Sequence, residues 1–357
     1  MKIGIFSKLE MAGGSEFRCA EMANGIARYT NHEVKIISEN GIPQRIGEYL
    51  DKSVYIVKNV FEKIDDEYPK VQEFYDLDCL LIINTDCKSF TGIDYWNGKS
   101  DRHGAVVDLT QIKKMVFLFN FIVSPSRHLS TISGYCKDIR MITTNSKFFN
   151  EISSQDRYES VRHMPRLILQ SPINPELLSN VKKESSRIRI GMHSRGQEDK
   201  WNSDWEKIIK KCNERFQDKI SFDFMGISKS LLSKVKGIPN VISRKENSIS
   251  VKEFLTGLDV FVFLPSWSRE EPWARVVAEA MTSGCPVITT KKGGNMDQII
   301  QGHNGFLCDN KDSVYKNIVY LVEHDTMRSV MSKNAFRLSK SFTTEKVISR
   351  FIEFIEA

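Results

Sequence analysis

The 357-residue sequence has no long apolar run and no recognisable export signal. No stretch approaches the roughly 20 consecutive apolar residues that a helix needs to cross a bilayer. The N-terminus enters a strand pattern directly, without the apolar segment and cleavage site of a signal peptide. With 41% hydrophobic and 27% charged residues, the composition is typical of a soluble globular protein. We therefore expect a cytoplasmic protein without a membrane span.

The patterns of common metal and cofactor sites are also missing. The seven cysteines are odd in number and scattered, and no two form a CxxC pair, which argues against a disulfide framework and a zinc site. A GxGxxG fingerprint is absent, so a nicotinamide or flavin cofactor has little support. We find no DxD-type ligand pair that calls for a divalent metal. The sequence predicts reduced thiols, no cofactor and no metal.

What the sequence does contain is an alternation of short apolar runs with longer helical patterns, which is typical of a parallel α/β architecture. A chain of this length accommodates two domains, each with its own core. We expect a first domain over residues 1–172 and a second over residues 173–340, because a segment with two prolines and a charged stretch lies between them. Residues 341–357 are predicted to end in an amphipathic helix.

Two glutamates eight positions apart, Glu271 and Glu279, form the most informative pair. Pro272 suits the first position of a helix, where its missing N–H costs nothing. Glu279 would then lie about 12 Å further along the axis, at about 1.5 Å per residue. Free N–H groups of the first turn would bind an anion between the two acids. The spacing fits a sugar, a diphosphate and a ribose in line, although an ordinary amphipathic helix also carries such acids.

The neighbours of this pair favour the ligand interpretation. Apolar runs at 259–264 and 286–290 suit buried parallel strands, and the glycine pair Gly293-Gly294 follows the second run. The stretch from residue 261 to residue 307 resembles the donor-binding half of family-four glycosyltransferases. The family's paired-glutamate signature falls on Glu271 and Glu279, and its glycine-pair loop falls on Gly293-Gly294.

This resemblance implies the GT-B fold, with two Rossmann-like domains whose parallel sheets face a cleft and a C-terminal helix that crosses back to the first domain. It also implies transfer from a nucleoside diphosphate sugar with retention of anomeric configuration. The donor's own phosphate oxygen would help to take the acceptor's proton. Glu279 would hold the ribose and Glu271 the sugar hydroxyls. Arg275 is a further expected donor contact.

Two cations follow the predicted strand at 187–193. Because ligands bind at the carboxyl ends of parallel strands, Arg195 and Lys200 are expected to point into the cleft. The family resemblance implies an arginine and a lysine at this spacing, which would stabilise the leaving diphosphate electrostatically. The alternative is an exposed loop of mixed charge, since Glu198 and Asp199 lie between them.

A second glycine pair, Gly13-Gly14, follows the first predicted strand and opens the first helix. Glycine there permits close approach of the backbone to a ligand and leaves helix N–H groups available to an anion. The resemblance implies a glycine loop near the donor phosphates at this position. A plain strand–helix turn is the alternative.

The chain departs from the family pattern at the transferred sugar. Many members have a histidine after the strand at 115–119, whereas this chain has Asn120 there and His128 eight residues later. Either residue is a candidate sugar contact. Ala274 stands where a glycine is frequent and would narrow the pocket. Trp273 beside it is a candidate donor contact, with packing against the domain as the favoured alternative.

The acceptor is not determined by the sequence. A loop at 94–104 is the best candidate for acceptor contacts, with a solvated turn as the equal alternative; its residues of interest are Trp96, Asp101, Arg102 and His103. A basic stretch from Lys113 to Lys147 would suit an anionic partner such as a membrane surface, an acidic glycan or DNA, or is simply a solvated helix face.

Our first expectation is a glycosyltransferase acting on a cell-surface polysaccharide or lipid-linked glycan. The first alternative is a phage-type enzyme that modifies hydroxymethylated DNA bases, whose binding would weaken steeply with salt. A nucleotide-sugar epimerase of the same fold needs no acceptor. A catalytically silent sugar-nucleotide sensor is suggested by the missing histidine.

Overall fold

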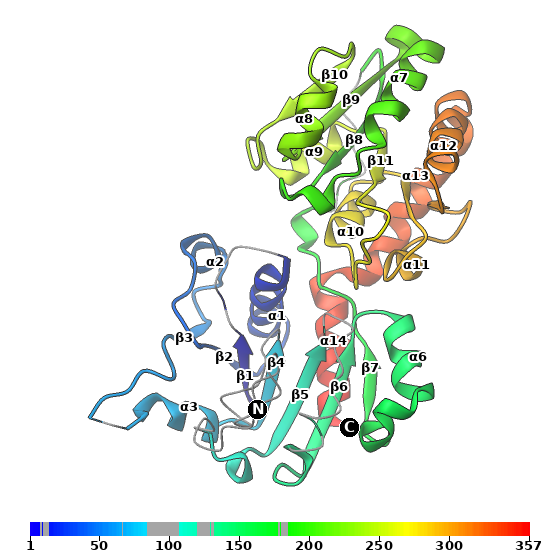
Figure 1. Cartoon of the computed structure of the whole chain (residues 1–357). Helices are drawn as coiled ribbons and strands as arrows, with labels where there is room; N and C mark the ends of the chain where they lie inside the picture. The colour runs from blue at the N-terminus through cyan, green and yellow to red at the C-terminus, as the bar shows by residue number, and fades with distance from the viewer. Residues whose placement is uncertain are drawn as a thin grey trace. The chain divides into compact units, whose positions relative to one another are not determined.

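The computed structural model describes residues 1–7, 9, 14–65, 67–83, 107–119, 129, 132–177, 179 and 185–357. The chain divides into two compact units (Figure 1). Unit 1 comprises Met1–Pro172 together with Thr344–Ala357, and unit 2 comprises Ile173–Thr343. Each unit is built on its own parallel sheet, so the predicted architecture of two α/β domains is confirmed.

The described strands of unit 1 form a seven-stranded sheet in the order β3-β2-β1-β4-β5-β6-β7, and every neighbouring pair is parallel. The order reverses between β1 and β4, as in a doubly wound fold. The strands are β1 Lys2–Ser7, β2 Glu33–Ser38, β3 Tyr55–Val57, β4 Cys79–Ile83, β5 Lys114–Phe119, β6 Asp138–Thr143 and β7 Arg166–Ile168. The described helices of this unit are α1 Gly14–Tyr29, α2 Gln44–Tyr49, α3 Gln72–Tyr75, α6 Ser146–Ser154 and α14 Thr344–Glu356.

The sheet of unit 2 repeats this plan with six parallel strands in the order β10-β9-β8-β11-β12-β13. Here the order reverses between β8 and β11. The strands are β8 Ile188–His193, β9 Ile220–Met225, β10 Val241–Arg244, β11 Val260–Phe263, β12 Val287–Thr290 and β13 Gly305–Cys308. The helices are α7 Trp205–Phe216, α8 Lys229–Val235, α9 Val251–Thr256, α10 Arg275–Thr282, α11 Asn295–Gln298, α12 Lys311–Glu323 and α13 Asp325–Ser339.

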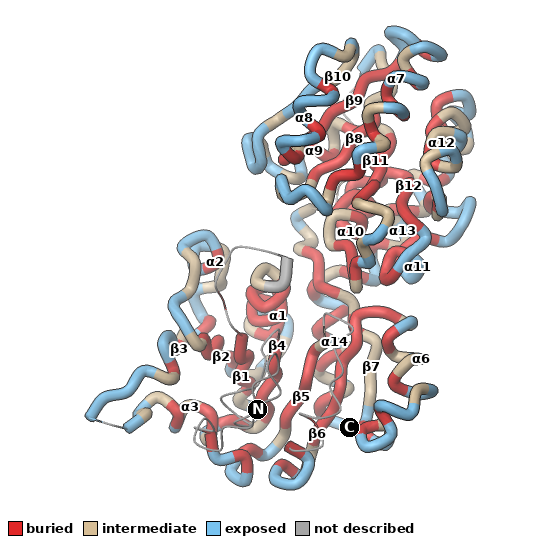
Figure 2. The backbone as a smooth tube through the Cα atoms, viewed as in Figure 1, coloured by how far each residue is buried: buried red, intermediate tan, exposed pale blue. Residues whose placement is uncertain are grey.

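The central strands of both sheets are buried on both faces, as Figure 2 shows. All residues of β4 and of β11 are buried. Strands covered on both sides by helices read as continuous apolar runs, which is why the sequence revealed them. Six cysteines are described, and they are buried and not joined in disulfides. Burial raises the pKa of the Cys19, Cys79 and Cys212 thiols to about 12.

No helix within the described part of the chain combines the length and the apolar character that a membrane crossing requires.

The C-terminal helix α14 belongs to the core of unit 1, where it packs against α1. Four of its apolar residues are fully buried at a helical spacing: Val347, Ile348, Phe351 and Ile355. Gly25 of α1 permits the close approach, since a Cβ there would lie 2.5 Å from side-chain carbons of both Ile348 and Thr344. The Thr344 hydroxyl also donates a hydrogen bond of 3.0 Å to the Glu21 carboxylate on α1.

Replacing Phe351 by alanine is expected to lower the free energy of unfolding of unit 1 by about 3–5 kcal/mol, because a large buried ring is removed. Native-state hydrogen exchange of the β1 and β4 amides measures this change. The matched control is Glu353→Ala on the exposed side of the same helix. Equal effects of the two substitutions would contradict the docking of α14 in this core.

Candidate functional site

Three loops of unit 2 leave the carboxyl edge of the sheet beside one another. They follow β8, β11 and β12, which are adjacent and parallel. The point between β8 and β11 is where the strand order reverses, and such switch points open a crevice that binds ligands in α/β proteins. Most of the residues predicted for the donor site lie on these loops or on the helix α10 that follows the second one.

Backbone and side-chain hydrogen bonds tie these loops together. The Ser266 amide donates to the Asp199 carbonyl oxygen at 3.0 Å, and the Asn202 side-chain amide donates to the Pro265 carbonyl oxygen at 2.9 Å. The Lys292 ammonium donates to the Trp267 carbonyl oxygen. Hydrogen bonds between the loops therefore fix the positions of the residues at this edge of the sheet.

Glu271 lies at the centre of this edge and is only 8% exposed. Its Oε1 accepts hydrogen bonds from the Lys200 ammonium and the Arg269 guanidinium. Burial opposes ionisation of this carboxyl, but the charges and hydrogen bonds of Lys200 and Arg269 outweigh burial and hold its pKa below the ordinary value. Arg269 also pairs with Asp199 on the loop after β8. Glu271 is thus a fixed, ionised carboxylate.

Lys200 is largely buried beside this carboxylate. Burial lowers the pKa of its ammonium by more than the attraction of Glu271 raises it, and the charges of Arg269 and Arg195 lower it further. Arg195 is therefore close enough for its charge to be felt at Lys200. Its own carbonyl oxygen accepts a hydrogen bond of 3.0 Å from the Trp201 indole. The structure brings together Arg195, Lys200 and Glu271.

The start of the helix after Glu271 differs from the prediction. Helix α10 begins at Arg275, with Ala274 as its N-cap, so Pro272 is not the first helical residue. Glu271 therefore does not lie on the axis of α10, and the expected spacing of about 12 Å along one helix was wrong. The physical reason is that residues 271–274 pack against the glycine loop, as described next.

The glycine pair that follows β12 lies against the backbone of this segment. The Gly294 amide donates to the Glu271 carbonyl oxygen at 2.8 Å. A Cβ on Gly293 would lie 2.3 Å from that oxygen, and a Cβ on Gly294 would lie 2.0 Å from the Pro272 carbonyl oxygen. Gly293 also has a φ of +53°, which favours glycine. Both glycines are needed to hold Glu271 in place.

Glu279 is the other predicted acid, on the second turn of α10, and it is 7% exposed. Its Oε1 accepts a hydrogen bond of 2.8 Å from Arg275, one helical turn earlier. Its Oε2 lies 3.4 Å from Nε2 of His193, the last residue of β8. Burial lowers the pKa of His193; Glu279 opposes this shift, and Arg275 adds to it. A neutral imidazole therefore faces the carboxylate.

Trp273 and Ala274 are both buried between Glu271 and α10. The Trp273 ring packs edge-on against Phe342, with ring centroids 5.0 Å apart, which is the packing alternative. The Ala274 carbonyl oxygen accepts a hydrogen bond of 3.0 Å from the Gln298 side chain on α11. Both residues therefore pack within unit 2, and a donor contact by either one stays a prediction.

Several residues predicted in unit 1 lie outside the described residues: Gly13, Trp96, Asp101, Arg102, His103, Asn120 and His128. Gly14 is described and is the first residue of α1. The loops that follow β1 and β4, at the reversal point of this sheet, fall mostly in the undescribed ranges.

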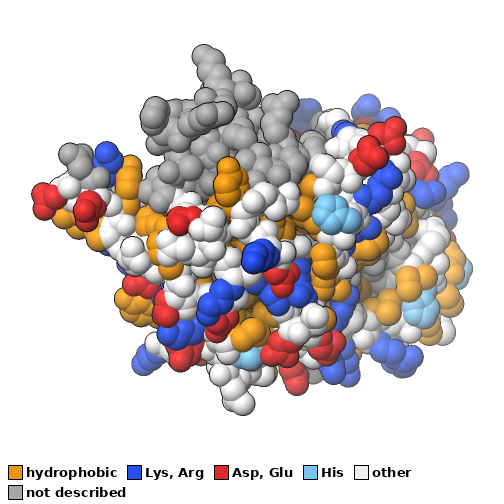
Figure 3. All heavy atoms as spheres, turned by 90° about the horizontal axis from the view of Figure 1, so that it is seen from below, with side chains coloured by type: hydrophobic (Ala, Val, Ile, Leu, Met, Phe, Trp, Pro, Cys, Tyr) orange, Lys and Arg blue, Asp and Glu red, His pale blue; other side chains and the backbone are white. Residues whose placement is uncertain are grey.

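The described part of the basic stretch contributes ion pairs to the fold of unit 1. Lys113 pairs with Asp78 at 2.7 Å, and Lys114 and Arg140 both pair with Asp138. Figure 3 shows Lys and Arg side chains interspersed with Asp and Glu over the face seen from below. These pairings weaken the case for the stretch as an anion-binding face, and contact with an anionic partner stays a prediction.

One run, Asp76-Leu77-Asp78, does have DxD spacing. Both aspartates are engaged by cations, Asp76 by Lys2 at 2.8 Å and Asp78 by Lys113. The contact with a lysine is the main reason that the pKa of each aspartate lies below its ordinary value. For Asp78, a hydrogen bond from the Lys2 backbone amide lowers the pKa further. Across the ranges that the structure describes, no three His, Cys, Asp or Glu residues are grouped as metal ligands.

Part of unit 2 is similar in sequence to known glycosyltransferases. Residues 228–338 match the family described as glycosyl transferases group 1. An uncharacterized glycosyltransferase of Methanocaldococcus jannaschii is 33% identical over 88 residues, covering 24% of this chain and 25% of that protein. Spore coat protein SA of Bacillus subtilis is 32% identical over 110 residues, covering 30% of this chain and 29% of that protein. The chain thus spans less than a third of the length of these relatives.

The likeness in structure extends over the whole chain. Anabaena HepE in complex with UDP has a TM-score of 0.73 and 16% identity, with 100% of both chains covered. Its complex with UDP-glucose has a TM-score of 0.70. The fold is therefore that of the GT-B class. The sequence match to residues 228–338 includes the stretch 261–307 and confirms the family-four resemblance recognised there.

Two residues of the site were missed by the sequence analysis, namely Arg269 and His193. His193 had a usable signal, because it is the last residue of a predicted strand and so had to lie at the functional edge. For Arg269 the only signal in the sequence was its position two residues before Glu271. Its contact with Asp199 could not be predicted, because the two residues are 70 positions apart.

The neutral, buried His193 predicts a pH effect on unit 2. In the unfolded chain this histidine takes up a proton below about pH 6.5. In the folded state its pKa is lower, so it stays neutral until the pH falls further. The free energy of unfolding should therefore fall as the pH drops from 7 through about 6.5. His193→Gln should flatten this dependence. Tryptophan fluorescence during urea unfolding measures it, since Trp201, Trp205, Trp267 and Trp273 all lie in unit 2.

The control for this experiment is His163→Gln, at an exposed histidine of unit 1. An unchanged pH dependence in the His193→Gln variant would show that this imidazole does not stay neutral in the folded protein.

Proposed function

We propose that this protein is a glycosyltransferase that moves a sugar from a nucleoside diphosphate sugar to an acceptor hydroxyl. The observation that carries the proposal is the contact of the buried Glu271 with the partly buried Lys200 and Arg269 at the switch point of the second sheet, where the charge of Arg195 also acts on Lys200. A fixed carboxylate beside clustered cations suits a ligand that presents hydroxyls next to a diphosphate.

The two acids would bind opposite ends of the donor. Glu279 would accept hydrogen bonds from the ribose hydroxyls, with Arg275 and His193 keeping its carboxylate in place. Glu271 would accept hydrogen bonds from hydroxyls of the transferred sugar. It is suited to this because its two cationic partners keep it ionised despite burial.

Arg195 and Lys200 would hold the diphosphate between these ends. As the glycosidic bond breaks, negative charge grows on the leaving phosphate, and cations fixed in a water-poor site stabilise it more than they would in bulk water. Lys200 would then share its ammonium between Glu271 and the phosphate. In this proposal the side chains of the protein stabilise the developing negative charge, and no metal or other cofactor is required.

We further propose that transfer proceeds with retention, with the donor's phosphate oxygen accepting the proton of the attacking hydroxyl. The acceptor class that we favour is a growing cell-surface polysaccharide or a lipid-linked glycan. UDP-sugars are the first donors to examine, because HepE, which shares the fold, was crystallised with UDP and with UDP-glucose.

A thermal-shift screen over UDP-, GDP-, ADP- and CDP-sugars tests the donor site. A ligand that binds only the folded state at 100 times its Kd stabilises it by about 2.7 kcal/mol. We expect one nucleotide class to raise the melting temperature, and Glu279→Gln to abolish that rise. A shift that persists in full in the variant would mean that the nucleotide binds elsewhere.

Removal of the Lys200 ammonium tests the catalytic role. With the donor and acceptor found by such screens, Lys200→Ala should lower kcat by about 10²–10³, the loss typical of one group that stabilises developing charge. Lys219→Ala, at an exposed lysine of the same unit, is the control. A kcat equal to that of the unmodified protein would rule out Lys200 as a catalytic residue. Transfer that requires an added acceptor would exclude an epimerase.

A further inference from the structure

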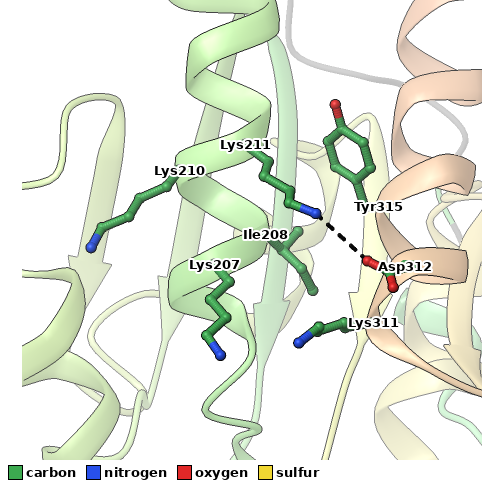
Figure 4. Close-up of a pocket in the computed structure, with 7 residues that line it drawn as sticks. All are labelled: Lys207, Ile208, Lys210, Lys211, Lys311, Asp312 and Tyr315. Carbon is green, nitrogen blue, oxygen red and sulfur yellow. Dashed lines mark ion pairs between the residues drawn. The ribbon is translucent and has the colours of Figure 1, made fainter.

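A second concave site lies in unit 2 between helices α7 and α12. It has a volume of about 260 Å³ and is lined by Lys207, Ile208, Lys210, Lys211, Lys311, Asp312 and Tyr315 (Figure 4). Four lysines and one aspartate give this lining a strongly positive charge. None of these residues belongs to the loops that follow β8, β11 and β12, so the site is separate from the proposed donor site.

Acidic neighbours engage some of these lysines but not all of them. Lys210 pairs with Glu206 at 2.7 Å, and Lys211 pairs with Asp312 at 3.6 Å. Among the described residues, Lys207 and Lys311 have no carboxylate within ion-pairing distance. Figure 4 shows the Lys207 and Lys311 side chains on opposite sides of the hollow, one from each helix, while Lys210 points away from it.

The base and wall of the hollow are apolar. Ile208 is 2% exposed beneath the lysines, and Tyr315 is partly buried on α12. The Lys211 ammonium lies 5.5 Å from the centre of the Tyr315 ring. An occupant would therefore meet two unpaired cations at one end and an apolar surface with an aromatic ring at the other.

We infer that this hollow binds a phosphate group carried on a small apolar or aromatic moiety. Two ammonium groups that line the same hollow repel each other, and a doubly charged phosphate that accepts hydrogen bonds from both relieves this repulsion. A carboxylate offers about half that charge. The volume lies just below the range of about 300–1,000 Å³ that drug-sized ligands occupy, so the hollow admits a phosphorylated ring or a lipid headgroup but not a complete nucleotide-sugar.

The decisive measurement is the rate at which an amine-acetylating reagent modifies individual lysines, read by mass spectrometry. Phenyl phosphate should slow the modification of Lys207 and Lys311 in the unmodified protein. Lys219 and Lys333, exposed elsewhere in unit 2, should react at an unchanged rate and serve as internal controls. Benzoate, with one charge, should protect less. Equal protection of all four lysines, or none at Lys207 and Lys311, overturns the inference.

A variant gives an independent readout. Lys207→Gln with Lys311→Gln should weaken phenyl phosphate binding in calorimetry by about tenfold, equivalent to about 1.4 kcal/mol. Lys219→Gln with Lys333→Gln removes the same charge and should have no such effect. Equal weakening by the two double variants would show that only the net charge of the protein matters, and would contradict the proposal.

The source of the phosphate group is settled by vesicles. If a lipid headgroup is the ligand, vesicles of phosphatidic acid and phosphatidylcholine should also protect Lys207 and Lys311, and vesicles of phosphatidylcholine alone should not. Protection by phenyl phosphate without protection by the anionic vesicles assigns the site to a free phosphoester. Each outcome supports the binding of a phosphate group.

Discussion

The arrangement of the second unit depends on one buried ionic contact, in which Glu271 is held between Lys200 and Arg269. Each partner comes from a different part of the edge: Lys200 from the loop after β8, and Arg269 from the loop that also carries Glu271. A buried ion pair contributes little net stability, because desolvation offsets attraction, yet removing one partner costs about 3–5 kcal/mol. The contact therefore fixes the geometry of the loops more than it strengthens the fold.

That constraint explains the features around it. The two glycines after β12 are needed because the backbone of Glu271 and Pro272 lies against them, and any side chain there would push the carboxylate out of place. Arg269 also engages Asp199, which brings the loop after β8 to the same point. The site is thereby preorganised, which is the property that lets charged groups act on a developing charge without first rearranging.

The sequence predicted the parallel strands and the residues at their carboxyl ends, because strands covered on both faces leave an unbroken apolar run. It also brought Arg195, Lys200, Glu271 and Glu279 into one region through the resemblance to a known family. It did not reveal the true start of α10, since the packing of Pro272 against Gly294, 22 residues later, overrides the local preference for a helix. Strand β3, with only three residues, was too short to show a pattern.

Pairings between distant positions were beyond the sequence for a physical reason. Lys200 and Glu271 are 71 positions apart and meet only because two loops of the same edge are cross-linked by hydrogen bonds. The meeting of Lys207 and Lys311 at one hollow similarly depends on how α7 and α12 pack. A propensity or a period describes one segment, whereas these contacts are set by the tertiary arrangement.

The return of α14 to the first unit has a consequence for biosynthesis. Residues 344–357 complete a core whose other parts are all made before Pro172. The first half of the chain therefore emerges from the ribosome before α14 can cover the apolar residues that it packs against, while the whole of the second unit is still to be translated. Domains usually fold in order from the N-terminus. Here unit 1 begins to be synthesised first but is completed only when α14 has been made. A circular permutant that places this helix ahead of β1 would restore the usual order.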